Sequence, residues 1–221
     1  LGWRRWLQAM EQVVAELVER AHAPLPKPVE AADPELSDRL NAEQCAAVRA
    51  LDQASVVLLS GGPGTGKTST VVEILARAEA RHPGLRIGLA APTGKAARRL
   101  GEAVMAQRAP LPCSTLHRWL EAGSRGFGRH RQRPLELDLL VIDEMSMLDL
   151  ALTQALLEAL PSGCRLLLVG DPAQLPPVGS GAVWHRLQQP DVRGRFGAGA
   201  VHLERTYRNR GALAQVAQQL R

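Results

Sequence analysis

The chain has 221 residues, of which 45% are hydrophobic, and it carries a formal net charge of +5 with a sequence pI near 9.7. This length and hydrophobic content exclude a disordered chain and predict one substantial core, in one domain with small attachments. The basic residues are nearly all arginine. Arginine permits a nucleic-acid partner because its guanidinium binds phosphate, although high-GC coding explains the arginine excess equally well.

Cysteine usage and hydropathy exclude further classes of protein. Cys45, Cys113 and Cys164 are far apart, odd in number and in no metal-binding spacing, so neither a disulfide framework nor a zinc site is expected. A reducing, cytoplasmic location is therefore expected. No apolar run is long enough to cross a membrane, and residues 1–6 do not resemble a signal peptide, so no membrane partner is expected.

The first predicted element is an amphipathic helix over residues 3–20, where apolar residues recur at helical spacing. Four prolines in residues 22–36 break this pattern and predict a linker or domain edge. We interpret residues 1–36 as the end of an N-terminal helical domain with its linker. A second helix is predicted to follow, with Asn41 as its N-cap and Glu43 near enough to support the cap.

From residue 55 onward, short aliphatic runs alternate with helical patterns. The aliphatic runs lie in residues 55–60, 86–93, 137–144 and 164–171, and the helical patterns in residues 69–81, 94–105 and 148–160. Strands that are apolar throughout and alternate with helices predict an α/β fold, with a parallel sheet covered by helices on both faces. Ligands of such sheets bind at the carboxyl ends of the strands, where every motif below lies.

The segment GGPGTGKT fits the phosphate-loop pattern G-x-x-x-x-G-K-[ST] at full length, between a strand and a helix. Its glycines let backbone N–H groups face phosphates at a helix N-terminus, while Lys67 neutralises the β/γ oxygens and Thr68 reaches a magnesium ion. The alternative is a glycine-rich turn with an exposed lysine, which the predicted strand before the segment and the predicted helix after it disfavour. The expected ATP-binding residues of the loop are Gly61, Gly62, Pro63, Gly64, Thr65, Gly66, Lys67, Thr68 and Ser69.

Two adjacent acids end the strand LLVIDE. A carboxylate there is costly unless it serves a cation, so Asp143 is interpreted as a water-mediated Mg²⁺ ligand, with Thr68 as the other protein ligand. Glu144 is placed to orient and deprotonate an attacking water. The acids could instead cap the next helix. A glutamate directly after the aspartate indicates hydrolysis rather than a kinase reaction, so an ATPase using ATP and Mg²⁺ is predicted.

Seven segments follow the order and approximate spacing of the superfamily 1 helicase motifs. They are LNAEQCAAV, GGPGTGKT, APTGKAARRL, STLHR, VIDEMSM, GDPAQLPPVGSG and LERTYR. In detail, residues 37–221 resemble RecD, the alpha subunit of exodeoxyribonuclease V, and the RecD-like 5′→3′ DNA helicases. The resemblance implies a RecA-like P-loop NTPase domain that couples ATP hydrolysis to 5′→3′ movement on single-stranded DNA in repair and recombination.

The resemblance also implies roles for single residues of the ATP site. Gln44 is expected to read the adenine edge, because an amide donates and accepts side by side. Arg208 corresponds to an arginine that touches the γ-phosphate, and its alternative is a surface helix arginine. Gln174 is expected to sense the γ-phosphate and to relay its state to the DNA. The predicted catalytic residues are Lys67, Asp143, Glu144, Gln174 and Arg208.

Seven residues are predicted to bind DNA. They are Pro92, Thr93, Lys95, Arg98, Thr115, His117 and Phe127. A helix N-terminus with a threonine and a lysine can hold a backbone phosphate without reading sequence. For Arg98 a solvated basic helix face is an equal alternative, and for His117 a buried imidazole is the commoner case in general. Residues 121–137 correspond to a strand-separating hairpin of RecD-like helicases, or form a flexible basic loop.

A superfamily 1 motor needs a second RecA-like domain, and these 221 residues do not contain its later motifs. The chain is therefore expected to be a fragment that binds nucleotide weakly and does not unwind DNA alone. The expected partners are single-stranded DNA and the other subunits of a RecBCD-type nuclease complex. Two other hypotheses stay open: a DNA-binding or assembly subunit with a vestigial ATP site, and a P-loop ATPase that remodels proteins.

Overall fold

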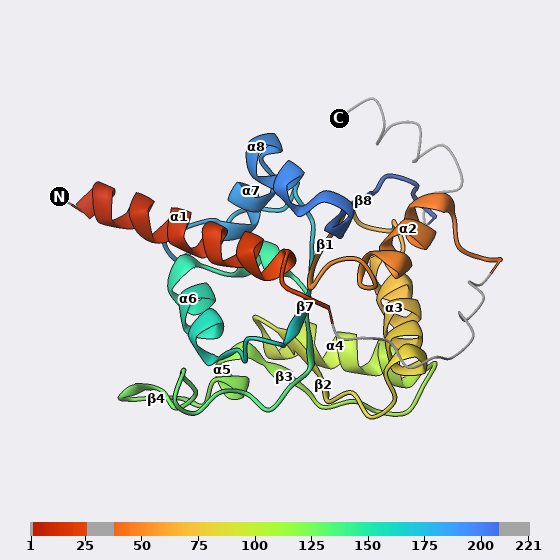
Figure 1. Cartoon of the computed structure of the whole chain (residues 1–221), viewed down its shortest axis with the longest axis horizontal. Coiled ribbons are helices and arrows are strands. Elements are labelled where there is room, and N and C mark those ends of the chain that lie inside the picture. Colours follow the sequence, from red (N-terminus) through yellow and green to blue (C-terminus); the bar gives the residue numbers. More distant parts are fainter. Residues whose placement is uncertain (1, 26–37, 208–221) are drawn as a thin grey trace.

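A parallel sheet of six strands organises the chain, in the order β3-β2-β6-β7-β1-β8 (Figure 1). The structure is a computed structural model and describes residues 2–25 and 38–207. The strands are β1 (Val56–Gly61), β2 (Ile87–Ala91), β3 (Cys113–Thr115), β6 (Leu139–Ile142), β7 (Arg165–Gly170) and β8 (Ala200–Leu203). All five pairings between neighbouring strands are parallel, which confirms the predicted α/β fold.

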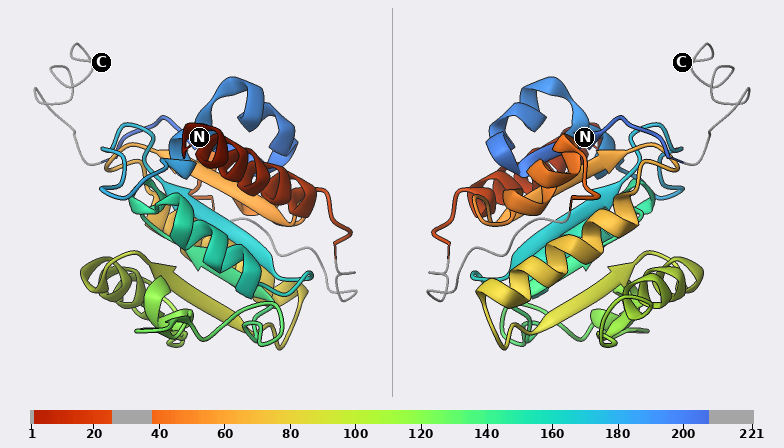
Figure 2. Two further views of the ribbon diagram at one scale, coloured as in Figure 1. Left: turned by 90° about the vertical axis from the view of Figure 1, so that its left-hand side faces the viewer. Right: turned by 90° about the vertical axis from the view of Figure 1, so that its right-hand side faces the viewer.

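Helices cover both faces of the sheet, as Figure 2 shows from opposite sides. The helices are α1 (Gly2–Ala21), α2 (Ala42–Ala50), α3 (Lys67–Arg81), α4 (Gly94–Met105), α5 (Leu116–Trp119), α6 (Leu150–Ala159), α7 (Val183–Gln188) and α8 (Pro190–Arg193), with 3-10 turns η1 (Met145–Met147) and η2 (Gly194–Gly199). None of the helices in the described ranges is long and apolar enough to cross a membrane.

The two faces of the sheet form two hydrophobic clusters. In β1, Val56 and Leu58 pack in the cluster with α1 and α6, whereas Val57 and Leu59 pack in the cluster with α2 and α3. Successive side chains of a strand point to opposite faces, so a strand covered on both sides must be apolar at every position. This is the physical reason for the continuous aliphatic runs in the sequence.

Helix α1 confirms the predicted amphipathic helix and packs on the same core as the sheet. Its apolar positions Met10, Val14 and Leu17 are buried with residues of β1 and α6. The amino-terminal end of α1 extends past the rest of the molecule (Figure 1), where Trp3 is exposed. The domain boundary expected after residue 36 stays a prediction, since residues 26–37 lie outside the described ranges.

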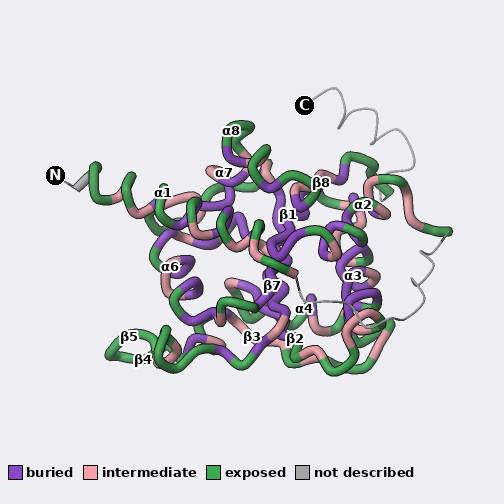
Figure 3. The backbone as a smooth tube through the Cα atoms, viewed as in Figure 1, coloured by how far each residue is buried: buried purple, intermediate pink, exposed green. Residues whose placement is uncertain are grey.

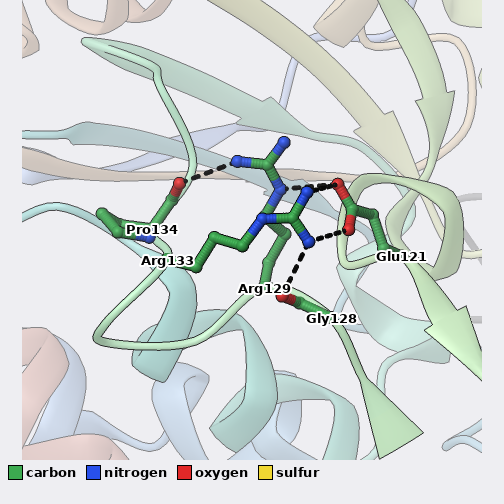
Figure 4. Close-up of polar contacts among 5 residues, drawn as sticks. All are labelled: Glu121, Gly128, Arg129, Arg133 and Pro134. Carbon is green, nitrogen blue, oxygen red and sulfur yellow. Dashed lines mark hydrogen bonds and ion pairs between the residues drawn. The ribbon is translucent and has the colours of Figure 1, made fainter.

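The insert after α5 contains a two-stranded antiparallel hairpin of β4 (Ala122–Gly123) and β5 (Gly126–Phe127). It is exposed on the surface (Figure 3). Glu121 stands at its base in a left-handed conformation with φ of 53°, and its carboxylate accepts hydrogen bonds from Arg129 and Arg133 (Figure 4). Arg129 also donates to the Pro134 carbonyl oxygen at 3.0 Å. These contacts favour a structured hairpin over the alternative of a flexible loop.

Candidate nucleotide and DNA sites

A cavity of about 330 Å³ opens at the carboxyl edge of the sheet, where β1, β6 and β7 end. Its lining residues are Pro63, Gly64, Thr65, Gly66, Lys67, Thr68, Ser69, Arg99, Asp143, Glu144, Asp171, Gln174 and Tyr207. The cavity thus brings the predicted phosphate loop together with the predicted acids and with Gln174. Segments more than one hundred residues apart in the chain meet here because parallel strands end at one edge.

The phosphate loop places Lys67 at the first position of α3. Gly66 caps the helix in a left-handed conformation with φ of 85° and no side-chain cap, so the first N–H groups of α3 stay available to an anion. The left-handed φ of Gly66 favours glycine, and a Cβ there would also lie 2.7 Å from Gln44 Nε2. Lys67 Nζ donates to the main-chain oxygens of Gly61 at 2.8 Å and of Gly62 at 3.0 Å.

Burial lowers the pKa of Lys67, while the carboxylates of Asp171, Asp143 and Glu144 act in the opposite direction. Burial likewise raises the pKa of Asp143, although its Oδ1 accepts a hydrogen bond from Glu144 N at 2.9 Å. A partly buried ammonium group near three carboxylates is typical of a site that binds a polyanion together with a metal ion. Thr68 and Asp143 both line the cavity, and their side-chain oxygen atoms are of the type that Mg²⁺ prefers.

The alternative that the two acids cap the next helix is wrong. Helix α6 is capped by Asp149, whose side chain accepts a hydrogen bond from Leu152 N. Glu144 precedes the 3-10 turn η1 and makes no capping hydrogen bond with its side chain. Its backbone is left-handed, with φ of 56°. A non-glycine residue in this region is uncommon, and such residues concentrate at functional sites.

Three residues of the cavity wall were not predicted as site residues: Arg99, Asp171 and Tyr207. Asp171 directly follows β7, just as Asp143 follows the neighbouring β6, so the same signal of an acid after an aliphatic run would have found it. Arg99 and Arg98 are both exposed on α4, and composition alone does not separate them. Tyr207 is held at the cavity by its N–H, which donates to the Gly64 carbonyl oxygen at 2.9 Å.

Gln44 lies beside the cavity rather than in its wall. It is buried, and its Oε1 accepts hydrogen bonds from Asn41 N at 3.1 Å and from the Tyr207 hydroxyl at 3.3 Å. Asn41 is the predicted N-cap of α2, but Gln44 and not Glu43 completes the capping box. The Glu43 carboxylate instead accepts from Glu204 N at 2.8 Å. The adenine-reading role of Gln44 stays a prediction.

Arg208, the predicted γ-phosphate arginine, lies outside the described residues. The described chain ends one residue earlier, at Tyr207 on the cavity wall. The role of Arg208 therefore stays a prediction.

The predicted DNA-binding residues lie at the ends of two neighbouring strands. Strands β2 and β3 pair in register with Ala91 opposite Thr115. Thr93 is the N-cap of α4 and Thr115 is the N-cap of α5, with their hydroxyls accepting from Ala96 N at 3.2 Å and Arg118 N at 3.3 Å. Pro92 is half-buried, and Lys95 and Arg98 are exposed, on the same end of α4.

His117 is exposed, so it is not the buried imidazole that a lone histidine suggests. Its ring centroid lies 6.5 Å from that of Phe127, which is 38% exposed on β5. The structure therefore brings the motif STLHR and the hairpin together on one surface. Pro92, Thr93 and Thr115 therefore lie at the carboxyl ends of β2 and β3, on the edge of the sheet where the cavity opens.

The sequence and fold are similar to those of known proteins. Residues 44–180 match the AAA domain family. The ATP-dependent RecD2 DNA helicase of Deinococcus radiodurans is 47% identical over 142 residues, covering 64% of this chain and 19% of that protein. The RecBCD enzyme subunit RecD of Mycolicibacterium smegmatis is 40% identical over 199 residues, covering 81% of this chain and 35% of that protein.

Solved structures show the same fold. The Pif1 helicase of Candida albicans superposes with a TM-score of 0.55 at 22% sequence identity, over 82% of this chain and 43% of that one. The chain thus spans less than half the length of each of these relatives. The matches confirm the resemblance to RecD-type proteins, and the family match covers residues from the helix before β1 to the loop after β7. The chain belongs to the AAA domain family.

Proposed function

We propose that the chain is the first RecA-like motor domain of an ATP-dependent DNA helicase that moves 5′→3′ on single-stranded DNA. The observation that carries this proposal is the cavity in which the phosphate loop, Asp143, Glu144 and Gln174 meet at one edge of the sheet. The likeness to the RecD2 DNA helicase and to RecD subunits of RecBCD enzymes supports the helicase part of this proposal. The direction of movement, and repair and recombination as the setting, come from the resemblance of the sequence motifs to those of RecD-like helicases.

The residues of the cavity are proposed to have separate roles in ATP hydrolysis. The N–H groups of the loop and Lys67 hold the phosphates, and Glu144 takes the proton of the attacking water. Thr68 and Asp143 would hold Mg²⁺, which neutralises charge on the β- and γ-phosphates when bound. Arg208 is proposed to add a fixed positive charge at the γ-phosphate, and Gln174 to report whether that phosphate is present.

Single-stranded DNA is proposed to cross the ends of β2 and β3. Thr93, Lys95, Thr115 and His117 offer hydroxyl, ammonium and imidazole groups to the backbone, beside Phe127 of the hairpin. With aromatic content of only 3%, binding should depend on phosphate contacts and weaken steeply with salt.

The free cysteines Cys45, Cys113 and Cys164 fit the proposed location in the reducing cytoplasm. The other subunits of a RecBCD-type complex are further proposed partners.

The decisive experiment measures ATP hydrolysis by the full-length protein with and without single-stranded DNA, with Glu144→Gln as the background control. Hydrolysis stimulated by DNA supports the motor. Absent hydrolysis indicates a subunit with a vestigial ATP site, and unstimulated hydrolysis indicates an ATPase that remodels proteins. The 221-residue chain is expected to bind nucleotide weakly and not to unwind a forked duplex. Unwinding by this chain alone would contradict the need for a second RecA-like domain.

A further inference from the structure

A buried serine holds the side chain of Gln174. Ser146 is fully buried in η1, and its Oγ donates a hydrogen bond to Gln174 Oε1 at 2.7 Å. We infer that Ser146 is a positioning residue, which fixes the Gln174 amide so that Nε2 is the atom left to face the nucleotide cavity. The inference rests on the proposed function, because it concerns how Gln174 senses the γ-phosphate.

The direction of this hydrogen bond decides which end of the amide is free. A phosphate oxygen only accepts hydrogen bonds, so Gln174 can bind it only through its NH₂ group. Within the described part of the chain, the Ser146 hydroxyl has Gln174 as its one hydrogen-bond partner. If the amide were reversed, the buried Ser146 proton would have no acceptor, which is unfavourable. The serine therefore selects the orientation in which Oε1 points to it and Nε2 points away.

The main chain of Gln174 is fixed independently of its amide. Its carbonyl oxygen accepts a hydrogen bond from His185 Nε2 of α7 at 3.1 Å, and its N–H donates to the Asp171 carbonyl oxygen at 3.4 Å. The Asp171 carboxylate tightens the same turn by accepting from Ala173 N at 2.8 Å. With the backbone held on two sides, the torsions of the Gln174 side chain remain free, and the hydrogen bond from Ser146 restricts them.

The same hydrogen bond joins two candidate catalytic loops. Ser146 lies two residues after Glu144, on the loop that follows β6, whereas Gln174 lies on the loop that follows β7. These strands are neighbours, paired from Leu139 opposite Arg165 to Ile142 opposite Leu168. The loop that carries Glu144 and the loop that carries Gln174 are thus linked by one partly buried hydrogen bond between side chains.

The test uses the full-length protein and DNA-stimulated ATP hydrolysis. Ser146→Ala should lower kcat about fivefold, the worth of one hydrogen bond, while KM for ATP changes less than about twofold. Ser55→Ala is the matched control, since Ser55 is also buried and donates to the Ala23 carbonyl oxygen at 3.4 Å, at the far end of β1. It should leave both constants unchanged. Equal kinetics of Ser146→Ala and the wild type would overturn the positioning role.

A double mutant separates orientation from simple packing. If Ser146 acts only through Gln174, the double variant Ser146→Ala/Gln174→Ala should hydrolyse ATP at the same rate as Gln174→Ala alone. Independent losses that multiply in the double variant would show a merely structural role and refute the inference. Ser146→Cys, which keeps a weak donor, should fall between Ser146→Ala and the wild type, and thermal unfolding confirms that each variant is folded at the assay temperature.

The two proposals fail in different ways. If the wild type shows no DNA-stimulated hydrolysis, the motor function is wrong and the inference about Ser146 fails with it. If the wild type is stimulated and Gln174→Ala is impaired while Ser146→Ala is not, only the inference about Ser146 fails.

Discussion

The ammonium group of Lys67 donates a hydrogen bond to the main-chain oxygen of Gly61 at 2.8 Å, within its own phosphate loop. A bound phosphate would offer this ammonium a charged acceptor in place of a neutral one, and charge-assisted hydrogen bonds are about twice as strong. Lys67→Ala should weaken nucleotide binding to the 221-residue chain by about tenfold or more, measured by titrating a fluorescent ATP analogue.

Lys95→Ala is the control for that titration. Lys95 is exposed on α4 and lies outside the cavity wall, so its removal should leave nucleotide affinity unchanged. Equal losses from both variants would mean that overall charge, rather than the loop, governs binding.

Asp143 should lower the stability of the protein while serving its function. Burial raises the pKa of its carboxyl, so the charged form costs folding free energy at neutral pH when no metal is present. Asp143→Asn should therefore melt at a higher temperature in EDTA, by about 2–4 °C for each kcal/mol relieved, and should lose Mg²⁺-dependent hydrolysis. A lower melting temperature in calorimetry would contradict this account.

The charged carboxylate of Asp138 should have the opposite effect and stabilise the fold. Hydrogen bonds from Arg86 hold the pKa of this carboxyl below its usual range, with Arg86 Nη2 at 2.8 Å from Oδ1. A lowered folded pKa gives stability that is present above the unfolded pKa, about 3.9, and lost as the pH falls through the folded value. Arg86 is exposed and solvent screens the pair, so Asp138→Asn should lower the unfolding free energy only slightly at pH 7. Urea unfolding at pH 7 and pH 3 should show that this difference becomes smaller in acid.

Gln44 combines a structural and a proposed recognition role, which two substitutions can separate. Gln44→Glu keeps oxygen acceptors for Asn41 N and the Tyr207 hydroxyl but removes the NH₂ donor, whereas Gln44→Ala removes both. The alanine variant should lose about 0.5–1.5 kcal/mol of unfolding free energy, because the hydrogen bond from Asn41 N is lost while Asn41 still caps the helix. Both variants should lose preference for ATP over GTP in competition binding. Unchanged preference in Gln44→Glu would reject adenine reading by this amide.

Glu121 should matter for strand separation and not for hydrolysis. Its carboxylate accepts from Arg129 at 2.8 Å and from Arg133 at 2.5 Å, and these contacts join the base of the hairpin to the segment after it (Figure 4). Glu121→Gln in the full-length protein should slow unwinding of a forked duplex several-fold while DNA-stimulated ATPase stays within about twofold. Glu136→Gln, in the same insert, is the control. If Glu121→Gln slowed unwinding and ATP hydrolysis equally, the result would argue against a strand-separating role of the hairpin.

The sequence predicted the sheet and most of the cavity because both depend on local signals. Aliphatic runs located β1, β2, β6 and β7, and the loop and its neighbouring acids follow these strands directly. Arg99 escaped prediction because only the packing of α4 decides which of two adjacent arginines reaches the cavity. Strand β8 also carried no clear run, since its residues alternate between half-buried and buried at the edge of the sheet. The contact of Ser146 with Gln174 could not be predicted either, because it depends on the register between β6 and β7.

Helix α4 connects the proposed DNA surface with the nucleotide cavity. Its first turn carries Thr93 and Lys95 at the proposed DNA surface, and Arg99 of the same helix reaches the nucleotide cavity. A helix of 12 residues with Leu100 and Val104 anchored in the core behaves as a stiff rod. The nucleotide cavity and the proposed DNA surface therefore share one rigid element, so a change in the position of α4 would alter both sites together.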